Sequence, residues 1–296
     1  DGFCLLHTIV SSNLIEFGVI QDYVVSFGSS YPTSIYPLNH RECFASTTKE
    51  LCRFERKNVK MKYKYQFAAS ILVPGTEFLI GVTAKFGKLL VLRTSDLSEP
   101  LIDDFQTDQH GIFHMIYSPK SRSVITIGSG ICVFTFDYDP AQLRISILKP
   151  NISLKRRSRF ADNYDTTILV PPPFDPEREV LLLPTPNGIT PYTLDGKPLE
   201  PYSIYPADIK TVYTFNHHTQ KLLLYDSNEG MTLWNSEKNL LSRFSTAGSS
   251  VVAMIFVDNE NVVCLNSYNS LFFLNIETGR TFHCTTLSQK PSRLFL

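Results

Sequence analysis

The sequence predicts an all-β protein, a β-propeller of seven four-stranded blades that takes up residues 1–296 as a single domain. Three observations favour this fold. Short runs rich in Val, Ile, Tyr and Phe alternate along the chain with clusters of Gly, Pro, Asn, Asp and Ser, as strands alternate with turns. Apolar residues are nowhere spaced as in an amphipathic helix. The runs also form groups of four that repeat roughly every 40 residues.

Both ends of the chain contribute to the predicted seventh blade. Residues 1–33 contain three strand-like runs, and residues 292–296 (SRLFL) resemble one more first strand. Sharing one blade between the two ends would close the ring and remove exposed sheet edges. The alternative is that residues 292–296 begin a second propeller. Because the sequence begins with Asp1 and not with Met, we expect it to be part of a longer chain.

Six whole blades are predicted between about residue 34 and residue 291. Their first strands begin at Ser34, Ala68, Ile112, Thr167, Ile209 and Val251, which are 34, 44, 55, 42 and 42 residues apart. The longest interval is explained by two insertions with the composition of loops, residues 155–165 (KRRSRFADNYD) and residues 171–178 (PPPFDPER). The prolines of the second insertion indicate either a stiff polyproline II protrusion or a long turn.

Two stretches carry a resemblance to the WD-repeat (WD40-like) family, in a divergent form. Residues 227–235 (SNEGMTLWN) resemble the turn and third strand that usually end in Trp-Asp. Residues 109–128 resemble the His-containing entry and the first two strands, with His110 at the place of the structural histidine. The resemblance covers nearly the whole chain and implies blades of about 40 to 45 residues.

The chain departs from the WD pattern in the turn between second and third strands, where the family has a structural Asp. Glu229, Asn187, Asn269 and Phe86 stand at about that place in four blades, and Trp234 is the single tryptophan. We therefore expect the packing of hydrophobic side chains, and not the hydrogen bonds of the WD pattern, to stabilise the blades. The chain has 21 Phe and 14 Tyr, and fully burying one such ring contributes about 1.5–3 kcal/mol.

Composition limits the classes of partner and compartment. With 28 basic and 28 acidic residues the net charge is zero, which argues against nucleic-acid binding. The longest apolar run, residues 251–257, is far shorter than the roughly 18 residues of a membrane-spanning helix. The six cysteines lack a C-x-x-C pair and are expected to be buried thiols, which favours an intracellular setting, cytoplasmic or cytoskeletal.

No catalytic, cofactor-binding or metal site is expected. Asp103 and Asp104 are neighbours in a strand-like run, so their side chains should point to opposite faces and not act as a carboxylate pair. His217 and His218 lie in a turn, and the further ligands of a metal site are missing.

The candidate partner-binding residues are loop residues. In WD-type propellers the loops after fourth strands and the turns between second and third strands share one face. The resemblance therefore places four basic residues on one face with two aromatic ones: Lys155, Arg156, Arg157, Arg159, Phe86 and Tyr268. Such a surface would suit an acidic protein partner, and the alternative is a merely solvated loop. Ser158 follows two arginines as in a basic-directed kinase target, and its phosphorylation would weaken the basic patch.

The sequence thus predicts a noncatalytic scaffold that binds other proteins, as a propeller domain of a larger intracellular assembly. A narrower version is a cytoskeletal or ciliary protein, because tubulin has an acidic surface. The alternative class is a propeller-type hydrolase or lyase with its site at the central channel.

Overall fold

The computed structural model describes the backbone of most predicted strands and of many turns. The residues described are 15–17, 25–27, 32–37, 42–47, 51–55, 58–63, 65–83, 87–107, 112, 114–128, 130–139, 144–148, 153–155, 172–185, 187–202, 211–227, 229–245 and 250–286. Within these ranges the secondary structure is β, with every pair of strands antiparallel. No helix in this part of the chain has the length and the apolar character that crossing a membrane requires.

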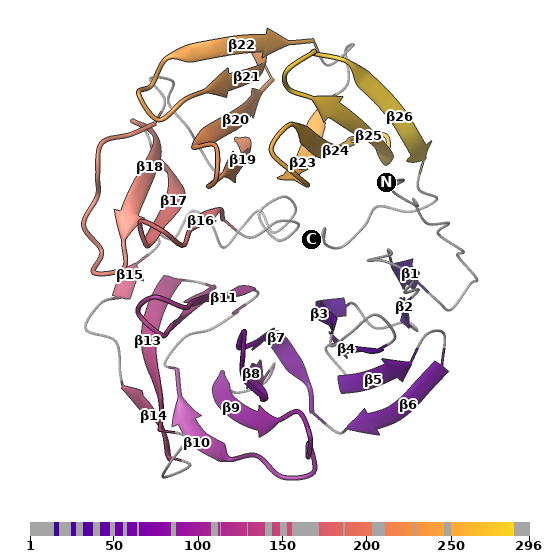
Figure 1. Cartoon of the computed structure of the whole chain (residues 1–296), viewed down its shortest axis with the longest axis vertical. Coiled ribbons are helices and arrows are strands. Elements are labelled where there is room, and N and C mark those ends of the chain that lie inside the picture. The colour runs from indigo at the N-terminus through magenta and orange to yellow at the C-terminus, as the bar shows by residue number, and fades with distance from the viewer. Residues whose placement is uncertain are drawn as a thin grey trace. The chain divides into compact units, whose positions relative to one another are not determined.

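Contacts between Cα atoms divide the chain into two compact units, with the boundary between Ser158 and Arg159. The first unit contains a two-stranded pair and three larger sheets (Figure 1). The strands are β1 (Ile15–Phe17), β2 (Val25–Phe27), β3 (Pro32–Pro37), β4 (Glu42–Thr47), β5 (Leu51–Glu55), β6 (Asn58–Tyr63), β7 (Phe67–Leu72), β8 (Phe78–Thr83), β9 (Lys88–Arg93), β10 (Ile102–Gln106), β11 (His114–Ser118), β12 (Ser123–Ile127), β13 (Gly130–Asp139), β14 (Arg144–Leu148) and β15 (Ser153–Lys155). They pair as β1–β2, β3 to β6, β7 to β10, and β11 to β14 with β15 beside β13.

The second unit contains three described sheets. Their strands are β16 (Phe174–Asp175), β17 (Val180–Thr185), β18 (Gly188–Thr193), β19 (Val212–Asn216), β20 (Lys221–Asp226), β21 (Gly230–Trp234), β22 (Leu240–Phe244), β23 (Val251–Phe256), β24 (Asn261–Asn266), β25 (Ser270–Asn275) and β26 (Thr281–Thr286). They pair in chain order as β16–β17–β18, β19 to β22 and β23 to β26. Residues 198–202 continue the first of these sheets, because Leu199 and Tyr202 donate backbone hydrogen bonds to Pro191 and Ile189 of β18.

The predicted four-strand groups are found in the sheets. Strands β3, β7, β11, β19 and β23 begin within a few residues of the predicted starts at Ser34, Ala68, Ile112, Ile209 and Val251. Strands β1 and β2 lie within the last two strand-like runs of residues 1–33. The first of those runs, residues 3–9, and the C-terminal residues 292–296 lie outside the described residues, so closure by a shared blade stays a prediction.

The two predicted insertions contain strands that the sequence analysis missed. Lys155, the first residue of one insertion, ends β15, which pairs with the edge of β13 that β14 leaves uncovered (Gly130 opposite Lys155). The other insertion contains β16 and the turn that follows it. Pro173 accepts a backbone hydrogen bond from Leu182 of β17, and the described part of this segment therefore lies along the sheet. A protruding polyproline arm is not what the structure has there.

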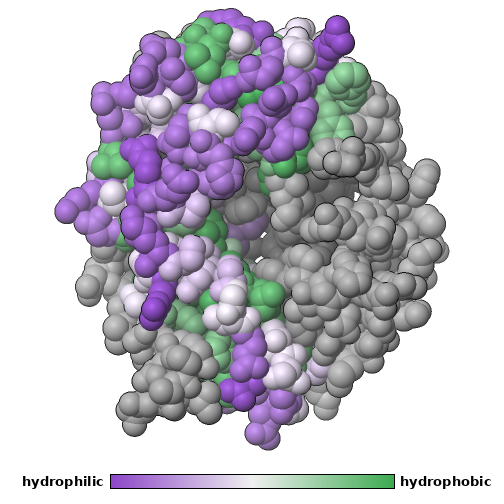
Figure 2. Space-filling model, in the orientation of Figure 1, coloured by the Kyte–Doolittle hydropathy of each residue, from purple (hydrophilic) through white to green (hydrophobic). Residues whose placement is uncertain are grey.

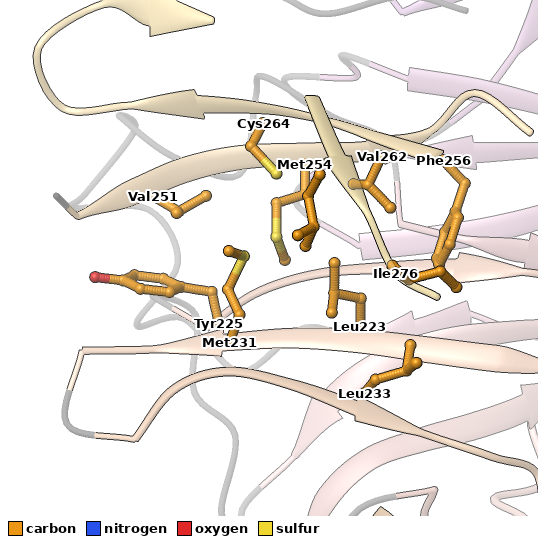
Figure 3. Packing of buried hydrophobic residues seen from close by; sticks show 11 residues of the cluster. Leu223, Tyr225, Met231, Leu233, Val251, Met254, Phe256, Val262, Cys264 and Ile276 are labelled. Atoms are coloured by element: carbon orange, nitrogen blue, oxygen red, sulfur yellow. The ribbon is translucent and has the colours of Figure 1, made fainter. Parts of the chain in front are cut away.

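The hydrophobic core lies between neighbouring sheets. First strands of successive sheets contact one another, β3 with β7, β7 with β11, and β19 with β23. In the second unit, Leu223 and Met231 of one sheet pack against Met254 and Val262 of the next, and all four are fully buried (Figure 3). Alternating apolar residues supply this packing, since every second side chain of a strand points to the same face.

Fourth strands carry a recurring irregularity. In all four of the described four-stranded sheets, the pairing of the third with the fourth strand shifts register once, in β6, β10, β22 and β26. Such bulges twist an edge strand and interrupt its row of free backbone groups. In β10 the shift falls between Ile102 and Phe105. The regular alternation that was predicted for Asp103 and Asp104 is therefore broken there, and Asp103 is exposed.

Candidate interaction surface

Tyr268 is the one predicted partner-binding residue whose side chain the structure describes, and it is the most exposed large hydrophobic residue among those described, at 71%. It lies in the turn between β24 and β25. The turn is held by Asn266, which is buried and whose Oδ1 accepts hydrogen bonds from the backbone N–H of Tyr268 (3.0 Å) and of Ser270 (2.9 Å). Asn269 completes the turn with a φ of 59°. The backbone is thus fixed while the ring remains in solvent.

The same arrangement recurs in other turns between second and third strands. The last residue of the second strand supplies a side-chain oxygen, and a backbone N–H of the turn or of the next strand donates to it: Lys88 to Thr83, Asn187 to Thr185, and Glu229 to Asp226. A glycine with positive φ follows three or four residues later, at Gly87, Gly188 and Gly230. An Asx or Ser/Thr turn of this kind satisfies the backbone locally.

These oxygen acceptors were missed by the sequence analysis. The WD pattern directed attention to Glu229, Asn187, Asn269 and Phe86 in the turn itself. The structure instead assigns the capping role to residues two or three positions earlier, at the ends of the second strands, such as Thr185 before Asn187 and Asp226 before Glu229. A signal was present, since an oxygen-bearing side chain ends each apolar run three or four residues before Gly or Asn.

The opposite ends of the second unit's sheets are joined by polar bonds from turn to turn. Asp175 is fully buried, and its Oδ1 accepts from the backbone N–H of Glu177 and Arg178. Its Oδ2 accepts from Gln220 Nε2 of the next sheet at 3.0 Å. Asn216 repeats the pattern, capping its own turn through Oδ1 while Nδ2 donates to the Asp258 carbonyl at 3.0 Å. The turns thereby form a continuous hydrogen-bonded row.

Tyr202 and Arg178 extend this row on the first of the three sheets. Arg178 Nη1 donates to the Tyr202 hydroxyl at 2.5 Å, and that hydroxyl donates to Gln220 Oε1 at 3.3 Å. Burial raises the pKa of Tyr202 above its ordinary value, although the nearby Arg178 acts in the other direction. The phenol therefore stays protonated and can donate its hydrogen bond. The row links sheets and has the character of a structural network.

Most of the predicted basic patch lies outside the described residues. Arg156, Arg157, Ser158, Arg159 and Phe86 are in this group. Lys155 is described only as the last residue of β15, so it belongs to a strand and not to a free loop. Its place on one surface with Tyr268 remains a prediction.

Within the described residues, few side chains that could act in catalysis or bind a metal ion lie close together. The rings of His217 and His218 lie 3.9 Å apart between centroids, in the turn after β19. Among the residues that the structure describes, no three or more His, Cys, Asp or Glu side chains are grouped so as to hold a metal ion. Cys132 and Cys264 are buried free thiols, as predicted for them, and burial raises the pKa of Cys264 strongly. No observation within these ranges favours the hydrolase or lyase alternative.

Comparison with known proteins gives matches in structure only. No family model matches the chain, and no curated protein matches it. The structure of Hsv2 from Kluyveromyces lactis is 12% identical, covers 84% of this chain and 74% of its own, and has a TM-score of 0.54. Hsv2 from Kluyveromyces marxianus is 14% identical over 84% of this chain and 77% of its own, with a TM-score of 0.53. The computationally designed protein Ika8 is 11% identical, the match covers 89% of this chain and 76% of Ika8, and the TM-score is again 0.53.

These likenesses bear on the fold alone, because identity is so low. Hsv2 is a WD40 β-propeller and Ika8 a designed propeller. The antiparallel sheets of this chain match theirs across most of its length. The all-β prediction and the resemblance to divergent WD repeats are both confirmed: the chain has a WD40-like β-propeller fold.

Proposed function

We propose that the chain is a noncatalytic module that binds other proteins, as one domain of a larger intracellular assembly. The observation that carries this proposal is Tyr268, whose ring is 71% exposed on a turn that Asn266 holds in place. A large aromatic side chain on a fixed backbone loses little conformational entropy on binding, and such residues dominate the binding energy of protein interfaces. The WD40-like fold supports the same class of function.

A photo-crosslinking experiment tests the role of Tyr268. A photoreactive phenylalanine analogue replaces Tyr268 in one sample and Leu101 in another, because Leu101 is also exposed, at 46%, but lies just before β10 in the other unit. We expect position 268 to give a discrete adduct with a partner protein. An excess of unlabelled wild-type chain should compete for the partner and suppress this adduct, whereas an excess of the Tyr268→Ala chain should not. Identical adducts from both positions would show that Tyr268 is not an anchor.

The basic segment, Lys155, Arg156, Arg157 and Arg159, is proposed as a second contact, together with Phe86. Its partner would be an acidic protein surface, and we propose the cytoskeleton, with tubulin as the specific candidate. Co-sedimentation with microtubules tests this. Binding should fall when the four charges are reversed, and also when the acidic tubulin tails are removed. Ser158→Glu should weaken binding as well, since it adds negative charge to the segment. Sedimentation that neither change affects would remove the basic segment from the proposal.

A further inference from the structure

Exposed leucines gather at the outer edge of the second unit. Leu240 and Leu241 are adjacent in β22, the outermost strand of its sheet, and are 39% and 45% exposed. Neighbouring residues of a regular strand point to opposite faces. Here the register shift between Leu233 and Trp234 leaves Leu241 as the extra residue of a bulge, opposite no partner in β21. Figure 2 shows hydrophobic surface over β22 with hydrophilic surface around it.

The preceding sheet, β16 to β18, adds a third leucine to this edge. Leu199 is 36% exposed and lies in residues 198–202, the outer segment that pairs with β18. An ion pair between Glu200 and Lys238 joins this segment to the turn before β22. Leu199 is the residue before Glu200, and Leu240 is two residues after Lys238. The ion pair therefore links the leucine-bearing segments of two sheets, and we call these residues the rim patch: Leu199, Leu240 and Leu241 with Glu200 and Glu237.

The rim patch presents negative charge to solvent. The side chain of Glu200 is 81% exposed, whereas that of its partner Lys238 is only 27% exposed. Glu237 is exposed as well, and its Oε2 accepts a hydrogen bond from Asn239. Farther along β22, Arg243 and Glu229 pair with each other at 2.6 Å, and their charges cancel. Lys197, two residues before Leu199, is 79% exposed and forms an ion pair with Asp195. Glu237 takes part in none of these ion pairs, so the balance of charge beside the leucines is negative.

We propose that the rim patch binds a basic amphipathic helix of a partner protein. Apolar side chains at helical spacing would cover the leucines, and lysines or arginines beside that stripe would meet Glu200 and Glu237. An extended segment is a poorer fit, because the bulge at Leu241 interrupts the free edge of β22 to which a strand would have to add. This surface is separate from the Tyr268 turn, so the chain would bind two partners at once.

Binding of synthetic helical peptides to the full chain tests the proposal. The probe is a fluorescently labelled peptide with leucines at helical spacing flanked by lysines. The matched control peptide has glutamates in place of the lysines. Anisotropy gives the affinity, and circular dichroism shows whether the peptide becomes helical on binding. Four variants are compared: Leu240→Ser with Leu241→Ser, Glu200→Lys, Tyr268→Ala, and Leu101→Ser as the control, since Leu101 is just as exposed at 46%.

We expect the basic peptide to bind as a helix and more tightly than the acidic one. The double leucine variant should weaken binding at least about tenfold, and Glu200→Lys should reverse the preference between the two peptides. Leu101→Ser should change nothing, and Tyr268→Ala should leave peptide binding intact even if the proposed function fails. Four results would overturn the proposal: no binding of the basic peptide, equal binding of both peptides, an equal loss with Leu101→Ser, or binding of the peptide in an extended conformation.

Discussion

Gly81 shows how a single residue determines local packing in the first unit. It lies in β8 opposite Ser70 of β7, and a Cβ atom at this position would stand 2.4 Å from Cε1 of Phe67, which is fully buried. The Phe67 ring occupies the space that any larger side chain would need. Only glycine at position 81 permits both the strand and the ring.

We expect Gly81→Ala to lower the free energy of unfolding by about 1–3 kcal/mol, because the buried ring must shift. Urea denaturation followed by circular dichroism measures the change. Phe67→Leu should be less harmful in the Gly81→Ala background than in the wild type, since the shorter side chain vacates the space. Additive effects of the two substitutions would contradict this account.

Asp258 makes stability depend on pH. Burial alone would raise the pKa of this carboxyl, but hydrogen bonds from the Asn261 side chain and from the backbone N–H of Glu260 and Asn261 lower it below its usual value. Because the folded-state pKa lies below the unfolded one, the carboxylate stabilises the fold above about pH 4. That contribution disappears as pH falls through the folded-state pKa.

We expect Asp258→Asn to flatten the acid side of the stability curve, since asparagine keeps the oxygen acceptor but cannot be protonated. Urea unfolding at a series of pH values from neutral to about pH 2 measures this. The wild type should lose its advantage over the variant as the pH falls. Parallel curves over the whole range would mean that the hydrogen bonds at Asp258 do not favour the charged form.

Turns are the elements in which one side chain does most to define the structure. Asn266 accepts two backbone hydrogen bonds in the β24–β25 turn, and Asn266→Ala would leave both N–H groups without that acceptor. We expect a loss of about 1–2 kcal/mol on urea unfolding and faster amide exchange at Tyr268 and Ser270. Asn266→Asp should recover most of the loss because it retains the acceptor. Tyr268→Ala is the control and should change stability by less than about 0.5 kcal/mol.

The strands that were predicted correctly are those whose own residues form a recognisable apolar run between polar turns. Residues 221–226 and 251–257 are apolar runs of strand length between polar turns, so local composition was sufficient. Strand β15 depends instead on the free edge of β13, a contact between segments about 20 residues apart that no local pattern records. Pairing likewise explains β16, whose sequence of prolines and charges has the composition of a loop.

The candidate site was predictable only in part. Tyr268 stood out because an aromatic residue between polar ones in a short turn has nothing to pack against. The capping residues could not be recognised in the same way. The turn requires only an oxygen atom at a given place, and Thr, Asp and Asn all provide one, so no single residue type marks the position. The bulge at Asp103 and Asp104 could not be predicted either, because it is a shift in the pairing of β10 with β9, which no local pattern records.

At the scale of the whole molecule, stability is divided among cores that each lie between neighbouring sheets. Repeats that contact only their neighbours keep a disturbance local. Trp234 is buried in the second unit, at 2% exposure, and is the single tryptophan, so its fluorescence reports on that unit alone. Ile80, fully buried in β8, belongs to the first unit.

We expect Ile80→Ala to lower the unfolding midpoint seen by circular dichroism by more than the midpoint seen by Trp234 fluorescence. The substitution should cost about 2–5 kcal/mol, because it leaves a cavity in the core. Val262→Ala, in the core of the second unit, is the matched control and should lower the fluorescence midpoint. If Ile80→Ala shifts both signals equally, the two units unfold as one cooperative body.

The oxygen acceptors at the ends of the second strands also bear on how such a chain evolves. Thr83, Thr185, Asp226 and Asn266 hold equivalent turns with three different side chains. Exchanges among them leave the backbone hydrogen bonds in place, so selection on the fold has little reason to oppose them. Accumulated over many blades, such neutral exchanges let a repeat keep its geometry while its sequence drifts away from any fixed signature. In a propeller stabilised in this way, the fold should be conserved more strongly than the amino-acid sequence.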